Sequence, residues 1–167
     1  YGSHEEFLPS SKTMTSVIVL WASKHPVTGE VHQEPNRIDL VWKLPDSTPF
    51  ETESYAIQDG NLLFLGTDAE SWSPGLPVFV PNLREGSTWE WRGTYNVVGK
   101  TTDSWATFTI TQSNENSYTV EAKLMTGNEN KPVTRKAHLT LQRHRFVTER
   151  EIEQSSKRNS PEQETRG

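Results

Sequence analysis

The stretch Thr88-Trp89-Glu90-Trp91-Arg92-Gly93-Thr94-Tyr95 decides the fold of this chain. Trp89, Trp91 and Tyr95 occupy alternate positions, and polar or charged residues lie between the first two. An apolar period of two residues is typical of an antiparallel β-strand with one buried and one solvated face. The sequence therefore predicts a half-buried strand over residues 88–95.

The same alternation recurs in the residues that follow. Further strands are predicted over 104–111, 118–124 and 137–141, and the run 145–152 is a candidate for one more. The gaps between these runs contain Gly, Asn and Pro, which favour turns. Four successive strands with short polar turns predict an up-and-down antiparallel meander.

The first half of the chain also contains runs that favour β-strands, separated by turn residues. The runs 16–22 and 37–44 are rich in aliphatic and aromatic residues and favour strands. Asp59-Gly60 separates two apolar runs, which is the chemistry of a two-residue type I′ hairpin turn. Three prolines in the segment 73–81 predict an irregular connection there, because proline is unfavourable in a central strand.

These patterns predict an all-β fold. We expect an antiparallel meander of about eight or nine strands, curled into a half-barrel or sandwich, with little helix. One β domain is expected over residues 13–153, after an extended N-terminal arm over 1–12. Residues 154–167 are predicted to be a disordered polar tail, because they hold too little apolar surface to offset the entropy of ordering.

The composition of the chain narrows the classes of function that it can have. The chain has 167 residues, a length suited to one domain, and no cysteine, which excludes disulfides, thiolate metal sites and cysteine nucleophiles. Its net charge of −5 gives no general attraction to nucleic acid or to an anionic membrane. The longest apolar run, 17–22, is far shorter than a membrane-spanning helix needs.

One part of the chain resembles a known group of proteins. The run 76–91, LPVFVPNLREGSTWEW, is similar to a segment that opens a strand in bacterial cell-envelope lipoproteins with a LolA-like or lipocalin-like half-barrel. The hairpin around Asp59-Gly60 and the late run 145–152 fit the same layout. The resemblance implies an extracytoplasmic setting and an apolar cavity, and it assigns no catalytic residue.

The aromatic residues of the predicted strands are the main candidates for ligand contact. They either form a filled core or line a slot for an apolar ligand, and a filled core is the commoner outcome. Trp72 lies outside the predicted strands and is the candidate for an exposed contact. The six residues proposed as ligand-binding are Trp42, Trp89, Trp91, Tyr95, Trp105 and Tyr118.

Cations concentrate near the end of the meander. They are candidates for contacts with a phosphate, a lipid headgroup or an acidic partner, and the alternative is that they protect an edge strand from pairing. The residues of this expected patch are Arg135, Lys136, His138, Arg143 and Arg145.

Glu30, His32 and Glu34 alternate, so in an extended segment their side chains point to one side and could ligate a divalent metal, with His25 as a fourth ligand. Gly29 and Pro35 bracket the triplet, which favours a loop or edge with solvated side chains. We therefore expect no metal site and no cofactor.

No motif of a hydrolase elbow, a phosphate-binding loop or a zinc protease occurs in the chain. The sequence favours a non-enzymatic, extracytoplasmic β domain that binds an apolar ligand or an envelope protein. Membrane contact is expected only through a lipid anchor upstream of Tyr1. Two alternatives remain open: a lipocalin-like carrier of a small hydrophobic molecule, and a β-barrel enzyme that uses buried carboxylates or histidines.

Overall fold

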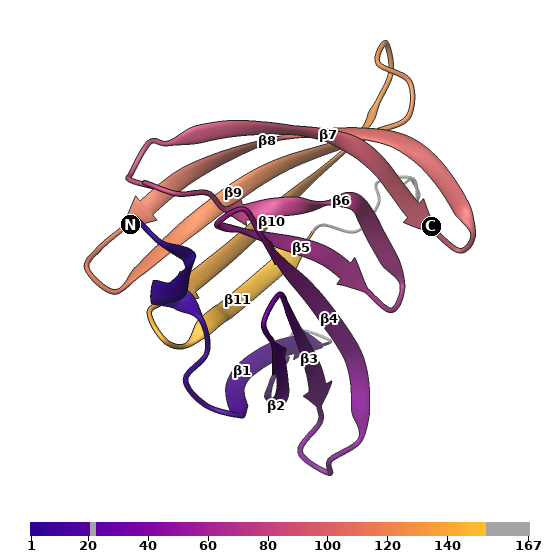
Figure 1. Ribbon diagram of the computed structural model, residues 1–167. Helices are drawn as coiled ribbons and strands as arrows, with labels where there is room; N and C mark the ends of the chain where they lie inside the picture. The colour runs from indigo at the N-terminus through magenta and orange to yellow at the C-terminus, as the bar shows by residue number, and fades with distance from the viewer. Residues whose placement is uncertain (21–22, 153–167) are drawn as a thin grey trace.

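The protein is a single antiparallel sheet that curls almost into a barrel, as the computed structural model of residues 1–20 and 23–152 shows (Figure 1). Eleven strands follow one another in sequence order, each paired with the next. They are β1 (Thr13–Leu20), β2 (Ser23–Glu34), β3 (Arg37–Lys43), β4 (Pro49–Gln58), β5 (Asn61–Thr67), β6 (Glu70–Phe79), β7 (Thr88–Val97), β8 (Lys100–Ser113), β9 (Ser117–Thr126), β10 (Val133–Gln142) and β11 (Phe146–Ile152). One short 3₁₀ helix, η1, spans His4–Phe7.

The predicted all-β meander is confirmed, but the strand count of eight or nine is wrong. The two strands that the sequence did not indicate are β2 and β6. In β2, polar residues surround Gly29, whose lack of a side chain leaves room for the ring of Trp42 across the strand pair. In β6, Pro74, Gly75 and Pro77 interrupt the alternation of apolar and polar residues that would have indicated a strand.

Two features of its strand pairing allow β6 to contain prolines. Its first residues, Glu70–Ser73, pair with β7, whereas Leu76, Pro77 and Phe79 pair with β5. Pro74 therefore lies where the ladder with β7 has ended, and register shifts interrupt the ladder with β5. A proline that has no ladder partner on one side loses no hydrogen bond there.

The hairpin predicted at Asp59-Gly60 is confirmed. Both residues have positive φ angles, 54° and 80°, as a type I′ turn requires, and Gln58 pairs with Asn61 across it. Val98 and Gly99 make a similar two-residue turn, with φ angles of 47° and 74°, between β7 and β8.

The barrel has a seam between its first and last strands. The side chain of Ser16 in β1 donates a hydrogen bond of 3.1 Å to the backbone carbonyl of Thr148 in β11. Among the described residues no backbone ladder joins β1 to β11. The sheet is thus nearly closed, and in the part of the chain that the structure describes both of these strands keep one unpaired edge.

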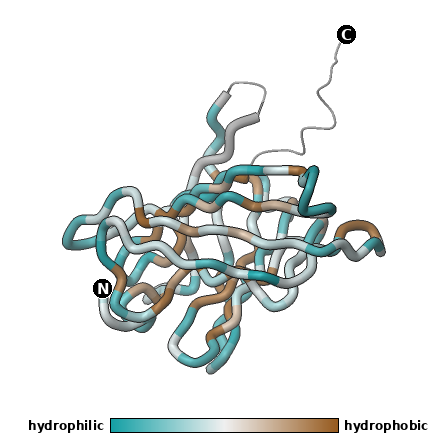
Figure 2. Tube along the Cα trace, turned by 90° about the horizontal axis from the view of Figure 1, so that it is seen from above, coloured by the Kyte–Doolittle hydropathy of each residue, from teal (hydrophilic) through white to brown (hydrophobic). Residues whose placement is uncertain are grey.

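The core fills the inside of the sheet. Alternate residues of each strand point inward, so that β8, for example, buries Ala106, Phe108 and Ile110 and exposes the residues between them to varying degrees. Apolar residues gather along the strands, and hydrophilic residues gather at most of the turns (Figure 2).

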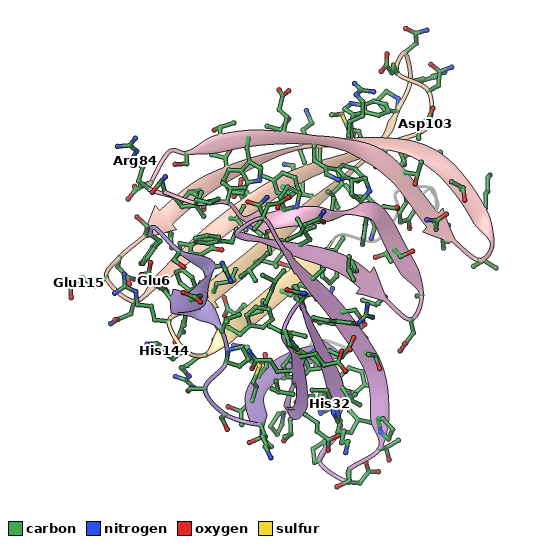
Figure 3. All side chains as sticks on the ribbon, in the orientation of Figure 1. Glu6, His32, Arg84, Asp103, Glu115 and His144 are labelled. Atoms are coloured by element: carbon green, nitrogen blue, oxygen red, sulfur yellow. The ribbon has the colours of Figure 1, made fainter. Side chains whose placement is uncertain are left out.

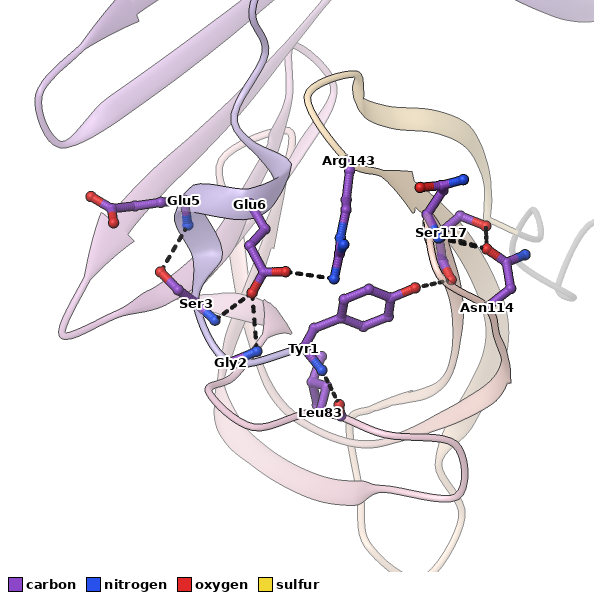
Figure 4. A network of polar contacts seen from close by, with 10 residues as sticks. Tyr1, Gly2, Ser3, Glu5, Glu6, Leu83, Asn114, Ser117 and Arg143 are labelled. Atoms are coloured by element: carbon purple, nitrogen blue, oxygen red, sulfur yellow. Dashed lines mark hydrogen bonds and ion pairs between the residues drawn. The ribbon is translucent and has the colours of Figure 1, made fainter.

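The N-terminal arm closes one end of the barrel (Figure 4). We expected 1–12 to be extended, whereas η1 interrupts it with a capping box in which Ser3 and Glu6 satisfy the free backbone N–H groups. Phe7 is fully buried, 5.1 Å from the ring of Tyr118 and 5.0 Å from that of Tyr1. Arg143 binds Glu6 at 2.8 Å and covers the Tyr1 ring, so arm and barrel interlock.

Loops of the same end surround the arm. Arg84, Glu115 and His144 lie around it in Figure 3, and His144 N–H donates to the carbonyl of Glu6. Within the described residues no helix is long and apolar enough to cross a membrane. The tail predicted over 154–167 lies outside the described residues.

Candidate functional site

The end of the barrel away from the arm holds ionised groups on its inner face. Glu51, Glu53 and Tyr55 alternate along β4, and all three point inward toward Arg150 of β11. The guanidinium of Arg150 donates to Glu53 at 2.6 Å and also to Glu51, and the Tyr55 hydroxyl donates to Glu53 at 3.0 Å. Two carboxyl groups therefore share one cation, an arrangement that we call the Arg150 cluster.

The two carboxyl groups of this cluster differ in environment. Glu53 is only 3% exposed and accepts bonds from both Arg150 and Tyr55. Burial raises the pKa of Glu51 to about 7, because desolvation and the charge of Glu53 together outweigh the attraction of Arg150. Glu51 therefore changes its charge near neutral pH.

A second ionised group lies on the strands across the barrel. Arg135 of β10 binds Glu70 of β6 at 2.9 Å and 3.2 Å, and the Tyr95 hydroxyl donates to Glu70 at 2.5 Å. Burial opposes ionisation of Glu70, but the bonds from Arg135 and Tyr95 outweigh it and hold the pKa of Glu70 below its usual range. Arg135 and Glu70 therefore balance each other's charge.

A cavity of about 790 Å³ opens beside the Arg150 cluster. Its size lies within the range of small-molecule sites. The lining residues come from both faces of β11, so the cavity reaches from the inside of the barrel past the seam with β1. They are Ser16, Val27, Trp42, Phe50, Glu51, Glu53, Thr111, Gln112, Thr119, Glu121, His138, Thr140, Val147, Thr148, Glu149, Arg150, Glu151 and Ile152.

Trp42 is the unusual member of this lining. Its side chain is buried, yet its indole Nε1 has no hydrogen-bond partner among the described residues. The six-membered ring lies against Gly29 on β2, and Glu51 is the register partner of Trp42 on β4. A buried donor without an acceptor is costly, so an indole N–H in this position calls for an acceptor from outside the described residues.

The structure separates the six aromatic residues predicted to share one surface. Trp42 lines the cavity, whereas Tyr118 and Trp91 are buried in the core and Trp89 and Tyr95 pack against it. Trp105 lies on the outer face of β8, opposite Arg92, whose guanidinium covers its ring at 5.5 Å. The cavity is lined by none of these except Trp42.

Trp89 and Trp91 join β7 to the part of β6 that forms no ladder with it. Trp89 Nε1 donates to the carbonyl of Pro77 at 2.8 Å, and Trp91 Nε1 donates to that of Pro74 at 3.0 Å. Trp89 also stacks on Phe108 with ring centroids 5.6 Å apart. These rings are structural, and they replace the backbone bonds that are missing between the two strands.

Trp72 does not make the exposed contact that we expected. It lies in β6 and is 3% exposed, with its ring 5.7 Å from Phe64 and 5.3 Å from Tyr95. The expectation failed because the prolines that follow Trp72 suggested a loop, whereas its strand pairs with β7 at this point.

The cations near the end of the meander do not form one patch. Arg135 points into the barrel, and its side chain is 11% exposed. Arg143 holds the N-terminal arm, while His138 lies on the outer face, 3.7 Å from Glu121. Lys136 and Arg145 are exposed, the first on the outer face of β10 and the second in the β10–β11 turn. Because β10 is paired on both sides, these cations do not protect an edge strand either.

The suggested metal triplet forms ion pairs on the surface instead. His32 lies 2.8 Å from Glu30, which also binds Lys43 at 3.0 Å. In the described part of the chain no three His, Asp or Glu side chains are arranged to hold a metal ion.

The Arg150 cluster is the part of the site that sequence reasoning missed. A signal was available, since Glu51 and Glu53 share the alternation of Tyr55 and Ile57 and so fall on the apolar face of their strand. Carboxyl groups on such a face need a partner. Nothing in the sequence indicated that the partner would be Arg150, almost a hundred residues away.

Comparison of the chain with protein-family models, with curated proteins and with solved structures finds no match. The fold and the site together define a nearly closed up-and-down β-barrel with a polar cavity at one end.

Proposed function

We propose that this protein is a non-enzymatic binding barrel whose cavity holds a small amphipathic molecule. The observation that carries the proposal is the buried Trp42, which lines a cavity of about 790 Å³ and whose N–H has no acceptor among the described residues. Val27, Phe50 and Ile152 supply apolar contact there, and Glu51 and Arg150 supply charge. This mixture suits an amphipathic ligand better than the purely apolar one expected at first.

Native mass spectrometry of the protein, isolated gently from its own host, tests the proposal. We expect an additional mass that is released on unfolding. Trp42→Phe keeps an aromatic ring but removes the donor, so it should retain less of this mass, whereas Trp105→Phe on the outer face should retain as much as the wild type. A bare chain mass for the wild-type protein would overturn the proposal.

The proposal includes an extracytoplasmic, cell-envelope location, which is supported by the resemblance of the run 76–91 to envelope lipoproteins. An envelope protein is the alternative partner. Fractionation of host cells that carry a tagged gene at its native locus tests the location, and recovery with the cytosolic fraction would contradict it.

One observation favours the enzymatic alternative. A carboxyl group that is partly protonated near neutral pH, Glu51, lies beside a second carboxyl group, Glu53. A carboxyl group whose pKa lies near the working pH can act as a general acid in the hydrolysis of a glycoside. Turnover of aryl glycosides that disappears in Glu51→Gln would support this alternative, and retention of an unchanged ligand would support binding.

A further inference from the structure

The cavity carries far more negative than positive charge. Its described lining includes five carboxyl groups, one guanidinium and one imidazole. Glu51, Glu53 and Arg150 lie on the inner face of the sheet, whereas Glu121, His138, Glu149 and Glu151 lie on its outer face, where the cavity passes the seam. A cavity lined mainly by one sign of charge attracts ligands of the opposite sign.

The inner part of the cavity has the same imbalance. Arg150 binds both Glu51 and Glu53, so among the described residues one negative charge stays without a matching cation when both carboxyl groups are ionised. Arg135, whose guanidinium also lies on the inner face, binds Glu70. An anionic ligand would meet no available guanidinium from either cluster.

Glu51 and Trp42 form one recognition surface. They are register partners on the inner face of β4 and β3, a pairing that brings Cβ atoms to within about 5.5 Å. A tryptophan ring attracts a cation to its face, and its N–H donates to an acceptor oxygen. The pair therefore combines a negative charge, an aromatic surface and a buried donor that has no acceptor among the described residues.

We propose that the cavity selects organic cations: an ammonium group that binds Glu51 beside the ring of Trp42, on a molecule whose hydroxyl or carbonyl oxygen accepts the Trp42 N–H. This inference rests on the proposed binding function and names the ligand class of the same site.

Four related probes separate the contributions of charge and acceptor. The probe 2-amino-1-phenylethanol carries both an ammonium and a hydroxyl, and 2-phenylethylamine carries the ammonium alone. Neutral 1-phenylethanol carries the hydroxyl alone, and 3-hydroxy-3-phenylpropionate combines the hydroxyl with an anion. Each is titrated into ¹⁵N-labelled protein at about pH 8, where Glu51 is ionised, while the indole ¹H–¹⁵N signal assigned through Trp42→Phe is followed.

The amino alcohol should bind tightest, about tenfold tighter than 1-phenylethanol, a difference of about 1.4 kcal/mol. The anion should bind weakest. In Glu51→Gln the affinity for the amino alcohol should fall about tenfold and that for 1-phenylethanol should stay unchanged. The control Glu90→Gln, on the outer face of β7, should change neither affinity. Trp42→Phe should remove the advantage of the amino alcohol over 2-phenylethylamine.

Two results would overturn the inference and leave the binding function intact. One is an anion that binds as tightly as the amino alcohol, and the other is an undiminished affinity for the amino alcohol in a folded Glu51→Gln protein. If no probe shifts the Trp42 signal up to its solubility limit, the cation inference falls. The mass of the protein isolated from its host then decides separately whether another class of ligand fills the cavity.

Discussion

Glu51 shows how the position of one residue changes its chemistry. It lies two residues from Glu53 on the same strand and the same face, yet only Glu53 is almost fully enclosed by Arg150 and Tyr55. Glu51 lines the cavity and contacts the same guanidinium. Burial with incomplete compensation keeps its proton bound up to about pH 7.

This shift predicts that Glu51 lowers the stability of the protein as pH rises. The pKa of Glu51 is about 7 in the folded chain, above the value of about 4.3 in an unfolded one. The folded state therefore binds more protons between these values, and its stability falls as pH increases through them. Glu51→Gln mimics the protonated group and leaves the Arg150–Glu53 pair in place, so it should remove this fall.

Urea denaturation at two pH values measures the effect. Partial exposure of Glu51 reduces the full electrostatic effect, so we expect Glu51→Gln to be more stable than the wild type by about 1–2 kcal/mol near pH 8. Near pH 4.5 the two proteins should differ little. The exposed Glu90→Gln should match the wild type at both pH values. An equal difference between Glu51→Gln and the wild type at both pH values would show that the pKa of Glu51 is not raised.

At the level of the strands, cross-strand register decides which side chains reach the core. Trp91 of β7 faces Ala106 of β8 and points inward, whereas Arg92 faces Trp105 and both point outward. Trp105 falls out of step with Ala106, Phe108 and Ile110, so alternation along its own strand already placed it on the outer face.

The two tryptophans should therefore differ in their contribution to stability. Trp91→Ala removes a buried ring and its hydrogen bond to Pro74, at a cost of roughly 3–5 kcal/mol. Trp105→Ala removes a partly exposed ring and its contact with Arg92, at a cost of about 1 kcal/mol. Denaturant unfolding of both variants measures the difference. Equal costs would mean that both rings are buried.

For the molecule as a whole, the barrel has one closed end, one polar end and a seam. The arm that contains Phe7 seals the first end, and the Arg150 cluster lies toward the second. Ladder hydrogen bonds run on both sides of the inner strands, but β1 and β11 are each bonded on one side. Local opening starts where backbone bonds are fewest.

Native-state hydrogen exchange should reflect this arrangement. Amides in β8 and β9, which pair over most of their lengths, should exchange slowest. Amides of β1 and β11 that face the seam should exchange fastest among the strand residues. A bound ligand should slow exchange in β11 more than in β8. Protection at the seam equal to that of β9 in the free protein would indicate that the barrel is closed by a backbone ladder.

The sequence by itself determined the all-β meander, the turn at Asp59-Gly60 and the inward faces of β7 to β10. These features depend on side-chain alternation and turn chemistry, which are local properties of the chain. Only the tertiary structure decided the burial of Trp72, the pairing of Arg135 with Glu70 and the pairing of Arg150 with Glu53. Each of these depends on the curvature and register of the sheet, which bring distant strands together. The cavity belongs to this second group, because the seam that opens it forms only when the first and last strands meet.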